Sequence, residues 1–224
     1  MHLLLLSLFL LLPGFPPFYL GFLSWFGLLP LLLYCQKVTP RQAWWGGLIF
    51  GFLFHLAIHH YLYTSFRFVL SSWFSLIVLA GMCFVLALYM GLFSLFVSYS
   101  YRKFPSALYL LSVPAAWVIL EYVRSLGLLG HTGGFLGYTQ IPNLFLLQPA
   151  AVYGIWGISF LMVLFQTLLL HWWQYKKGTA LYRPIGATLF FLFFLAIGLL
   201  LPETFPVEKE SENYKILLVQ GNIA

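Results

Sequence analysis

Two ionisable side chains stand one helical turn apart inside an apolar stretch, Glu121 and Arg124. Glu121 is the only acidic residue before position 203. Side chains at i and i+3 on a helix can meet, so the pair can neutralise itself. An ionisable group in a membrane helix is costly unless it is paired or faces water. The pattern therefore fits both a functional site and a structural tether at the end of the helix.

A glycine-rich segment with polar side chains follows this pair at 127–140. It lacks the Lys-Ser/Thr pair of a phosphate-binding loop and the glycine spacing of a dinucleotide-binding fingerprint. Irregular backbone at membrane depth is tolerated where protein buries it or where it lines a wet cavity. The segment is thus either a loop that lines a cavity or an ordinary loop outside the membrane.

Histidines form a second candidate site in "HLAIHH", where His55 and His59 share a helix face and His60 lies beside them. This i, i+4 spacing suits a metal ion or haem in a helical bundle. A polar helix face is the other interpretation, because a metal site needs further ligands. We predict no metal site and no cofactor.

Familiar catalytic groups are missing from these apolar segments. The sequence contains no aspartate, so a Ser-His-Asp triad is not available. Cys35 and Cys83 lie in or beside apolar runs, where a cysteine is typically a small buried hydrophobe. We therefore predict no catalytic residue in this chain.

The composition indicates which elements must position these residues. Hydrophobic residues make up 62% of the 224-residue chain and charged residues 7%, against roughly 25% charged in soluble domains. The chain is accordingly predicted to be an all-α polytopic membrane protein. The net charge of +6 comes from short basic clusters between apolar runs, so membrane topology explains it better than nucleic-acid binding.

Apolar runs predict about seven transmembrane helices. They cover 2–12, 18–35, 43–63, 73–100, 106–127, 150–174 and 184–201. With a cytoplasmic N-terminus, seven basic residues fall on the inner side and four on the outer side. The positive-inside rule therefore favours a cytoplasmic N-terminus and an extracytoplasmic C-terminus.

The composition changes after this membrane domain, predicted to cover 1–201. Four of the five acids fall in 202–214, which we interpret as an extracytoplasmic linker. The short apolar run in 215–224 is typical of a buried strand that leads into a loop. A lone strand is unstable, so we expect the chain to stop at the first strand of a truncated second domain.

Several motifs resemble bacterial apolipoprotein N-acyltransferases. They are Pro-Ala-x-Trp…Glu-Tyr-x-Arg-Ser (114–125), Gly-Tyr-Thr-Gln (137–140), Tyr-Gly-x-x-Gly-x-Ser-Phe (153–160) and "ILLVQGNI" (216–223). The last is similar to the opening strand of the family's α/β nitrilase-like domain. One departure is the stretch 131–135, His-Thr-Gly-Gly-Phe, where the family usually has Phe-Pro-Trp or a similar sequence.

The resemblance implies a multi-pass protein of the bacterial plasma (inner) membrane that serves lipoprotein maturation. The family transfers an acyl chain from a phospholipid to the N-terminal diacylglyceryl-cysteine of apolipoproteins, using a Glu-Lys-Cys triad in the nitrilase-like domain. This chain ends before that triad, so we expect it to be inactive alone. The implied partners are the phospholipid donor, the lipoprotein acceptor and membrane lipids, with no nucleic acid.

Five residues are predicted to line or brace the lipid entrance near the outer leaflet. They are Glu121, Arg124, Gly137, Tyr138 and Gln140. Two other functions remain open: a small permease or haem- or metal-binding membrane protein that uses His55 and His59, and a non-catalytic remnant of a split gene.

Overall fold

A computed structural model describes residues 1–127, 130–178 and 183–204, and helices are the only regular secondary structure in this part of the chain. The fold class predicted from the apolar runs is therefore confirmed. The α-helices are α1 (His2–Leu11), α2 (Ser24–Gly27), α3 (Leu29–Lys37), α4 (Pro40–His59), α5 (Leu62–Arg67), α6 (Ser72–Lys103), α7 (Ser106–Ser125), α8 (Leu144–Leu147), α9 (Ala150–Lys176) and α10 (Ile185–Thr204). Three short 3-10 helices are η1 (Leu12–Gly14), η2 (Gly21–Leu23) and η3 (Leu136–Gln140).

Three of these helices, α6, α7 and α9, are long and apolar enough to cross a membrane. Two shorter apolar helices cover His2–Gly14 and Ile185–Leu200. These findings support a membrane protein, while the predicted count of seven spans stays a prediction. Most of the predicted linker and the predicted strand lie outside the described residues.

The predicted run 18–35 does not form one helix, which corrects that expectation. It is divided into η2, α2 and α3. Pro30 lies in the first turn of α3 and has no N–H to donate to the preceding turn, so the helix restarts there. The run 43–63 is divided as well, because α4 ends at His59 and α5 begins at Leu62.

The most extensive helix packing among the described residues joins α4 to α6. Gly47 and Gly51 lie one turn apart on α4 and face α6. A Cβ atom at Gly47 would lie 2.6 Å from the Met90 carbonyl oxygen, and one at Gly51 would lie 2.6 Å from Met90 Cβ. Small residues at this spacing let two membrane helices approach closely, which is how packing holds helices together in lipid.

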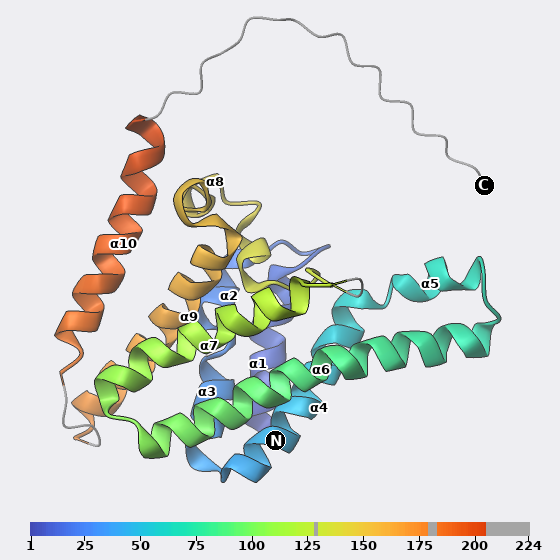
Figure 1. The fold of residues 1–224 in the computed structure, drawn as a ribbon, viewed down its shortest axis with the longest axis horizontal. Helices are drawn as coiled ribbons and strands as arrows, with labels where there is room; N and C mark the ends of the chain where they lie inside the picture. The colour runs from blue at the N-terminus through green and yellow to red at the C-terminus, as the bar shows by residue number, and fades with distance from the viewer. Residues whose placement is uncertain (128–129, 179–182, 205–224) are drawn as a thin grey trace, which may run out of the picture.

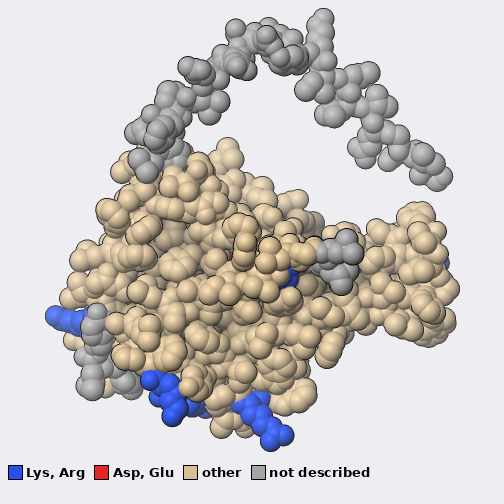
Figure 2. All heavy atoms as spheres, viewed as in Figure 1, with Lys and Arg blue, Asp and Glu red and all other residues tan. Residues whose placement is uncertain are grey.

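The two ends of the molecule differ in their charge. The basic end is formed by the C-terminal ends of α3, α6 and α9, which carry Lys37, Arg102, Lys103 and Lys176. The opposite, loop end holds the last turn of α7, η3 and the start of α9 (Figure 1). Figure 2 shows that most visible basic side chains gather along the basic end. Figure 1 also shows α5 and the first turns of α6 projecting together beyond the other helices.

Candidate functional site at the loop end

Glu121 joins α7 to η3 in the interior of the loop end. Its side chain is only 3% exposed. One carboxyl oxygen, Oε1, accepts a hydrogen bond from Trp117 Nε1 at 2.9 Å and another from the Leu136 backbone N–H at 2.8 Å. The second oxygen has no hydrogen-bond partner among the described residues. Glu121 therefore fixes the position at which η3 begins.

Arg124 is buried as well, but it faces α4. Its Nη1 atom lies 3.3 Å from His55 Nε2, and the guanidinium lies 5.0 Å from the centre of the Phe135 ring. Its Nε and Nη2 atoms have no hydrogen-bond partner in the part of the chain that the structure describes. Arg124 consequently offers two nitrogens, with three N–H donors between them, inside the protein.

The opposite charges of Glu121 and Arg124 interact, as their spacing suggests, but the two side chains make no direct hydrogen bond to each other. Each polar atom of the two side chains either has a different partner or has none among the described residues. Three residues advance an α-helix by about 300°, so the side chains leave α7 about 60° apart and point to different neighbours. Both line a small cavity of about 10 Å³. That is roughly the space one water molecule needs, so a water could bridge the two groups.

Three histidines continue this polar cluster from α4 into the glycine-rich segment. His59 Nδ1 lies 2.9 Å from the His55 carbonyl oxygen, and because a carbonyl only accepts, Nδ1 carries the proton. His59 Nε2 is then an acceptor, and His131 Nε2, at 2.7 Å, must be the donor. His55 Nε2 accepts from Arg124, since arginine only donates. The cluster thus links α4, α7 and the segment after α7.

This geometry gives the haem or metal alternative no support. The Nε2 atoms of all three histidines are engaged by protein groups. Across the residues 1–127, 130–178 and 183–204, no group of three or more His, Cys, Asp or Glu side chains could hold a metal ion. His60, also part of the predicted cluster, points elsewhere, with its Nδ1 2.8 Å from the Ala57 carbonyl oxygen.

Gln140 holds the N-terminal segment against η3. Its Oε1 accepts from Trp25 Nε1 at 3.0 Å, and its Nε2 donates to the Gly21 carbonyl oxygen at 2.9 Å. A Cβ atom at Gly21 would overlap the Thr139 carbonyl oxygen, so only glycine permits this approach. The Gln140 side chain is 1% exposed. It braces the loop end from inside and is not open to solvent or lipid.

The remaining predicted residues also lie in η3. Gly137 donates its backbone N–H to Ser159 Oγ at 3.0 Å, which ties η3 to α9. Tyr138 is half-buried, and its ring packs against that of Phe135 with the ring centres 5.6 Å apart. The structure therefore brings all five predicted residues to one end of the bundle, around the short helix η3.

An open cavity of about 420 Å³ lies next to this braced segment, and its lining is both polar and apolar. None of the five predicted residues lines it. The lining residues are Tyr19, Gly21, Phe22, Thr139, Pro142, Asn143 and Leu144. Two of the lining residues have distinctive local geometry. Tyr19 has a positive φ of 56°, which is uncommon for a residue other than glycine. Asn143 caps α8 by accepting a hydrogen bond from the Leu146 N–H.

Sequence comparison places the fold in a family. The family model for the apolipoprotein N-acyltransferase N-terminal domain matches residues 7–168. The chain is 30% identical to an apolipoprotein N-acyltransferase of Geobacter metallireducens, over 94% of this chain and 40% of that protein. It is 33% identical to one of Coxiella burnetii, over 86% of this chain and 40% of that protein.

A relative from Thermotoga maritima, also named apolipoprotein N-acyltransferase, is 30% identical over 98% of this chain and 44% of its own length. The chain thus spans less than half the length of these relatives. The matched residues include α7, η3 and most of α9, the elements that form the loop end. The chain therefore belongs to the family of the apolipoprotein N-acyltransferase N-terminal domain.

Proposed function

We propose that this chain is the membrane domain that supports acyl transfer to lipoproteins in the bacterial plasma membrane. The chain crosses the membrane several times, with its N-terminus in the cytoplasm and its C-terminus outside. The reaction served moves an acyl chain from a phospholipid to the N-terminal diacylglyceryl-cysteine of an apolipoprotein. Similarity to relatives named for this activity, over nearly the whole chain, carries the proposal.

The loop end is the part of the domain that meets the lipid substrates. The residues that line its open cavity include the aromatic Tyr19 and Phe22 and the polar Asn143. A phospholipid or a diacylglyceryl-cysteine likewise combines apolar chains with a polar head. Thr139 lines this cavity and is the neighbour of Gln140, so the bracing network sets the position of one wall. The predicted role of Glu121, Arg124, Gly137, Tyr138 and Gln140 at the lipid entrance is, on this proposal, to hold that wall.

No acid-base or nucleophilic step is assigned to residues of this chain. Cys35 and Cys83 are both buried, and neither lines the loop-end cavity. Catalysis would require a Glu-Lys-Cys triad like that of the family's nitrilase-like domain, supplied in addition to residues 1–224. The role of this chain is then to anchor that domain and to present lipids to it.

Complementation tests the proposal. The open reading frame that contains this chain is expressed in bacteria depleted of their own lipoprotein N-acyltransferase, and mass spectrometry measures N-acylation of a reporter lipoprotein. Acylation by the complete frame, but not by residues 1–224 alone, is the expected result. A complete frame that is expressed and membrane-inserted yet never acylates the reporter would favour a non-catalytic remnant.

A wall variant adds specificity to the test. Leu144 lines the loop-end cavity and is 76% exposed, so Leu144→Trp adds a large ring there without disturbing a buried contact. The complete frame carrying it should lose reporter acylation while its amount in the membrane stays the same. Phe68→Trp is the matched control, because Phe68 is 86% exposed on the projecting α5–α6 arm. Full acylation by the correctly inserted Leu144→Trp variant would show that this cavity does not serve the reaction.

A further inference from the structure

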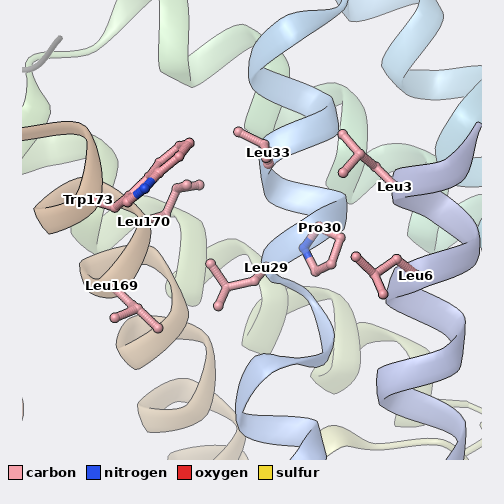
Figure 3. Close-up of a pocket in the computed structure, with 8 residues that line it drawn as sticks. All are labelled: Leu3, Leu6, Leu29, Pro30, Leu33, Leu169, Leu170 and Trp173. Carbon is pink, nitrogen blue, oxygen red and sulfur yellow. The ribbon is translucent and has the colours of Figure 1, made fainter. Parts of the chain in front are cut away.

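A second cavity, of about 350 Å³, lies at the basic end of the molecule, between α1, α3 and α9 (Figure 3). Every side chain that lines it is leucine, proline or tryptophan. Leu3 and Leu6 come from α1, Leu29 and Leu33 from α3, and Leu169 and Trp173 from α9. We call it the lysine groove, for the residues described next. It is separate from the loop-end cavity, with which it shares no lining residue.

Both long walls of the lysine groove end in a lysine. On α3 the lining residues Leu29 and Leu33 are four residues apart, and the next position in that row is Lys37. On α9 the row Leu169 and Trp173 continues in the same way to Lys177. Residues four apart lie on the same face of a helix, so both lysines stand on the groove side of their helices.

The two lysines lie at the same end of the groove. Gln36 and Gln174, each next to one row, are joined by a hydrogen bond, so the C-terminal ends of α3 and α9 are neighbours. Figure 3 shows Leu33 and Trp173 at one level of the groove, with Leu29 and Leu169 at the next level away. The Lys177 ammonium lies 4.0 Å from the centre of the Trp173 ring, which holds this charge at the mouth of the groove.

These charges have no acidic partner in the membrane domain. The only acid before Glu203 is Glu121, which is buried at the loop end. Lys37 and Lys177 are both exposed. Basic pockets between membrane helices attract anionic lipid headgroups, and an apolar groove accepts an acyl chain without the cost of burying a polar group.

We propose that the lysine groove binds one anionic phospholipid from the leaflet at the basic end. An acyl chain lies between α1, α3 and α9, and the phosphate lies between Lys37 and Lys177. The site is independent of the proposed acyl transfer, because it is at the opposite end from the loop-end cavity. Its ligand is a structural lipid that joins the three helices.

Native mass spectrometry of the purified 224-residue chain tests this site. The probes are phosphatidylglycerol and phosphatidylcholine with the same acyl chains. Each basic residue near an anionic membrane surface contributes about 1 kcal/mol, which corresponds to about fivefold in binding. The double variant Lys37→Gln/Lys177→Gln should therefore lower the preference for phosphatidylglycerol by on the order of 30-fold. These lysines are exposed, so the variant should fold.

Matched controls make the result specific. Lys103→Gln removes a charge at the basic end from α6, which contributes no residue to the groove, and should keep the preference. Leu33→Trp fills the groove and should remove binding of both lipids, whereas Leu53→Trp on α4 should not. Three results would overturn the proposal. They are equal binding of the two lipids to the wild type, a loss of preference in Lys103→Gln as large as in the double variant, and full lipid occupancy in Leu33→Trp. A groove-filling variant that changes only the oligomeric state would also overturn it, because the groove would then hold a second copy.

Discussion

The Nε2 atoms of His59 and His131 lie 2.7 Å apart, and they join the end of α4 to the glycine-rich segment that follows α7. Their rings meet edge to face, with centres 4.7 Å apart. A Cβ atom at Gly133 would overlap His131 Nε2, so this backbone passes directly over the contact. The structure shows what the histidine at position 131 does: its hydrogen bond to His59 ties the loop to α4.

This contact should make the loop end sensitive to acid. Burial, and to a smaller extent the nearby charge of Arg124, lower the pKa of His131 below its ordinary value. A histidine in the unfolded chain has a pKa of about 6.5, so the unfolded chain binds this proton more readily than the folded chain does. Stability should be constant above about pH 6.5 and should fall as the pH drops below that value. Thermal melting of the detergent-solubilised chain between pH 5 and pH 8 measures the effect.

Two variants show whether His131 is the group responsible. Gln in His131→Gln can still donate an N–H to His59 but does not titrate, so its melting curve should depend less on pH. His60→Gln changes a histidine whose ring is bound to the Ala57 carbonyl oxygen and not to His131, and should keep the wild-type dependence. An unchanged acid sensitivity in His131→Gln would assign the titration to another group.

A second prediction asks whether Glu121 stabilises the fold as a hydrogen-bond acceptor or through its negative charge. Glu121→Gln keeps an Oε1 atom that can accept from Trp117 and Leu136, so the melting temperature should change little. Glu121→Ala leaves both donors buried without a partner, at about 1–3 kcal/mol each, and should lower the melting temperature by several degrees or more. If Glu121→Gln is as unstable as Glu121→Ala, the negative charge itself is required.

The sequence predicted most helices well because their signal is local. The helices at 72–103 and 106–125 match the apolar runs 73–100 and 106–127 to within three residues. The burial of Glu121 and Arg124 also followed from their place in an apolar run. Their partners did not, because the direction of a side chain around the helix axis depends on which helices lie next to it. The broken run at 18–35 was missed because its overall hydrophobicity hides Pro30.

Side-chain contacts between residues far apart in the sequence could not be predicted, for a different reason. Helical spacing correctly placed His59 beside His55, and their rings stack with centres 5.4 Å apart. It gave no sign of the second partner of His59, which is His131, 72 residues away. Trp25 gave no signal at all, because its contact with Gln140 spans 115 residues. Serine at position 159 belonged to a motif of the family, yet its bond to Gly137 could be recognised only once η3 and α9 were placed side by side.

The contact between Trp25 and Gln140 leads to a third prediction. Gln140→Ala removes the acceptor for the indole N–H and the donor to the Gly21 carbonyl oxygen, and should destabilise the chain by about 1–3 kcal/mol. Trp25→Phe removes only the indole donor. In a double-mutant cycle on melting stability, the two changes should couple by at least about 0.5 kcal/mol, as directly interacting residues do. Fully additive effects would mean that the bond contributes nothing.

A final prediction compares two glycines inside helices, Gly47 on α4 and Gly81 on α6. A methyl group at Gly47 would lie 2.6 Å from the Met90 carbonyl oxygen, a backbone atom that cannot turn aside. Gly47→Ala should therefore push α4 away from α6 and destabilise the chain by about 1–3 kcal/mol. A Cβ atom at Gly81 would meet nothing within 4 Å, so Gly81→Ala should gain up to about 1 kcal/mol from helix propensity alone. The melting temperatures of both variants are measured in the same detergent. The chemical change is identical, so the difference between the two melting temperatures reports the packing of α4 against α6. Equal changes in melting temperature would show that the close approach of these helices does not stabilise the fold.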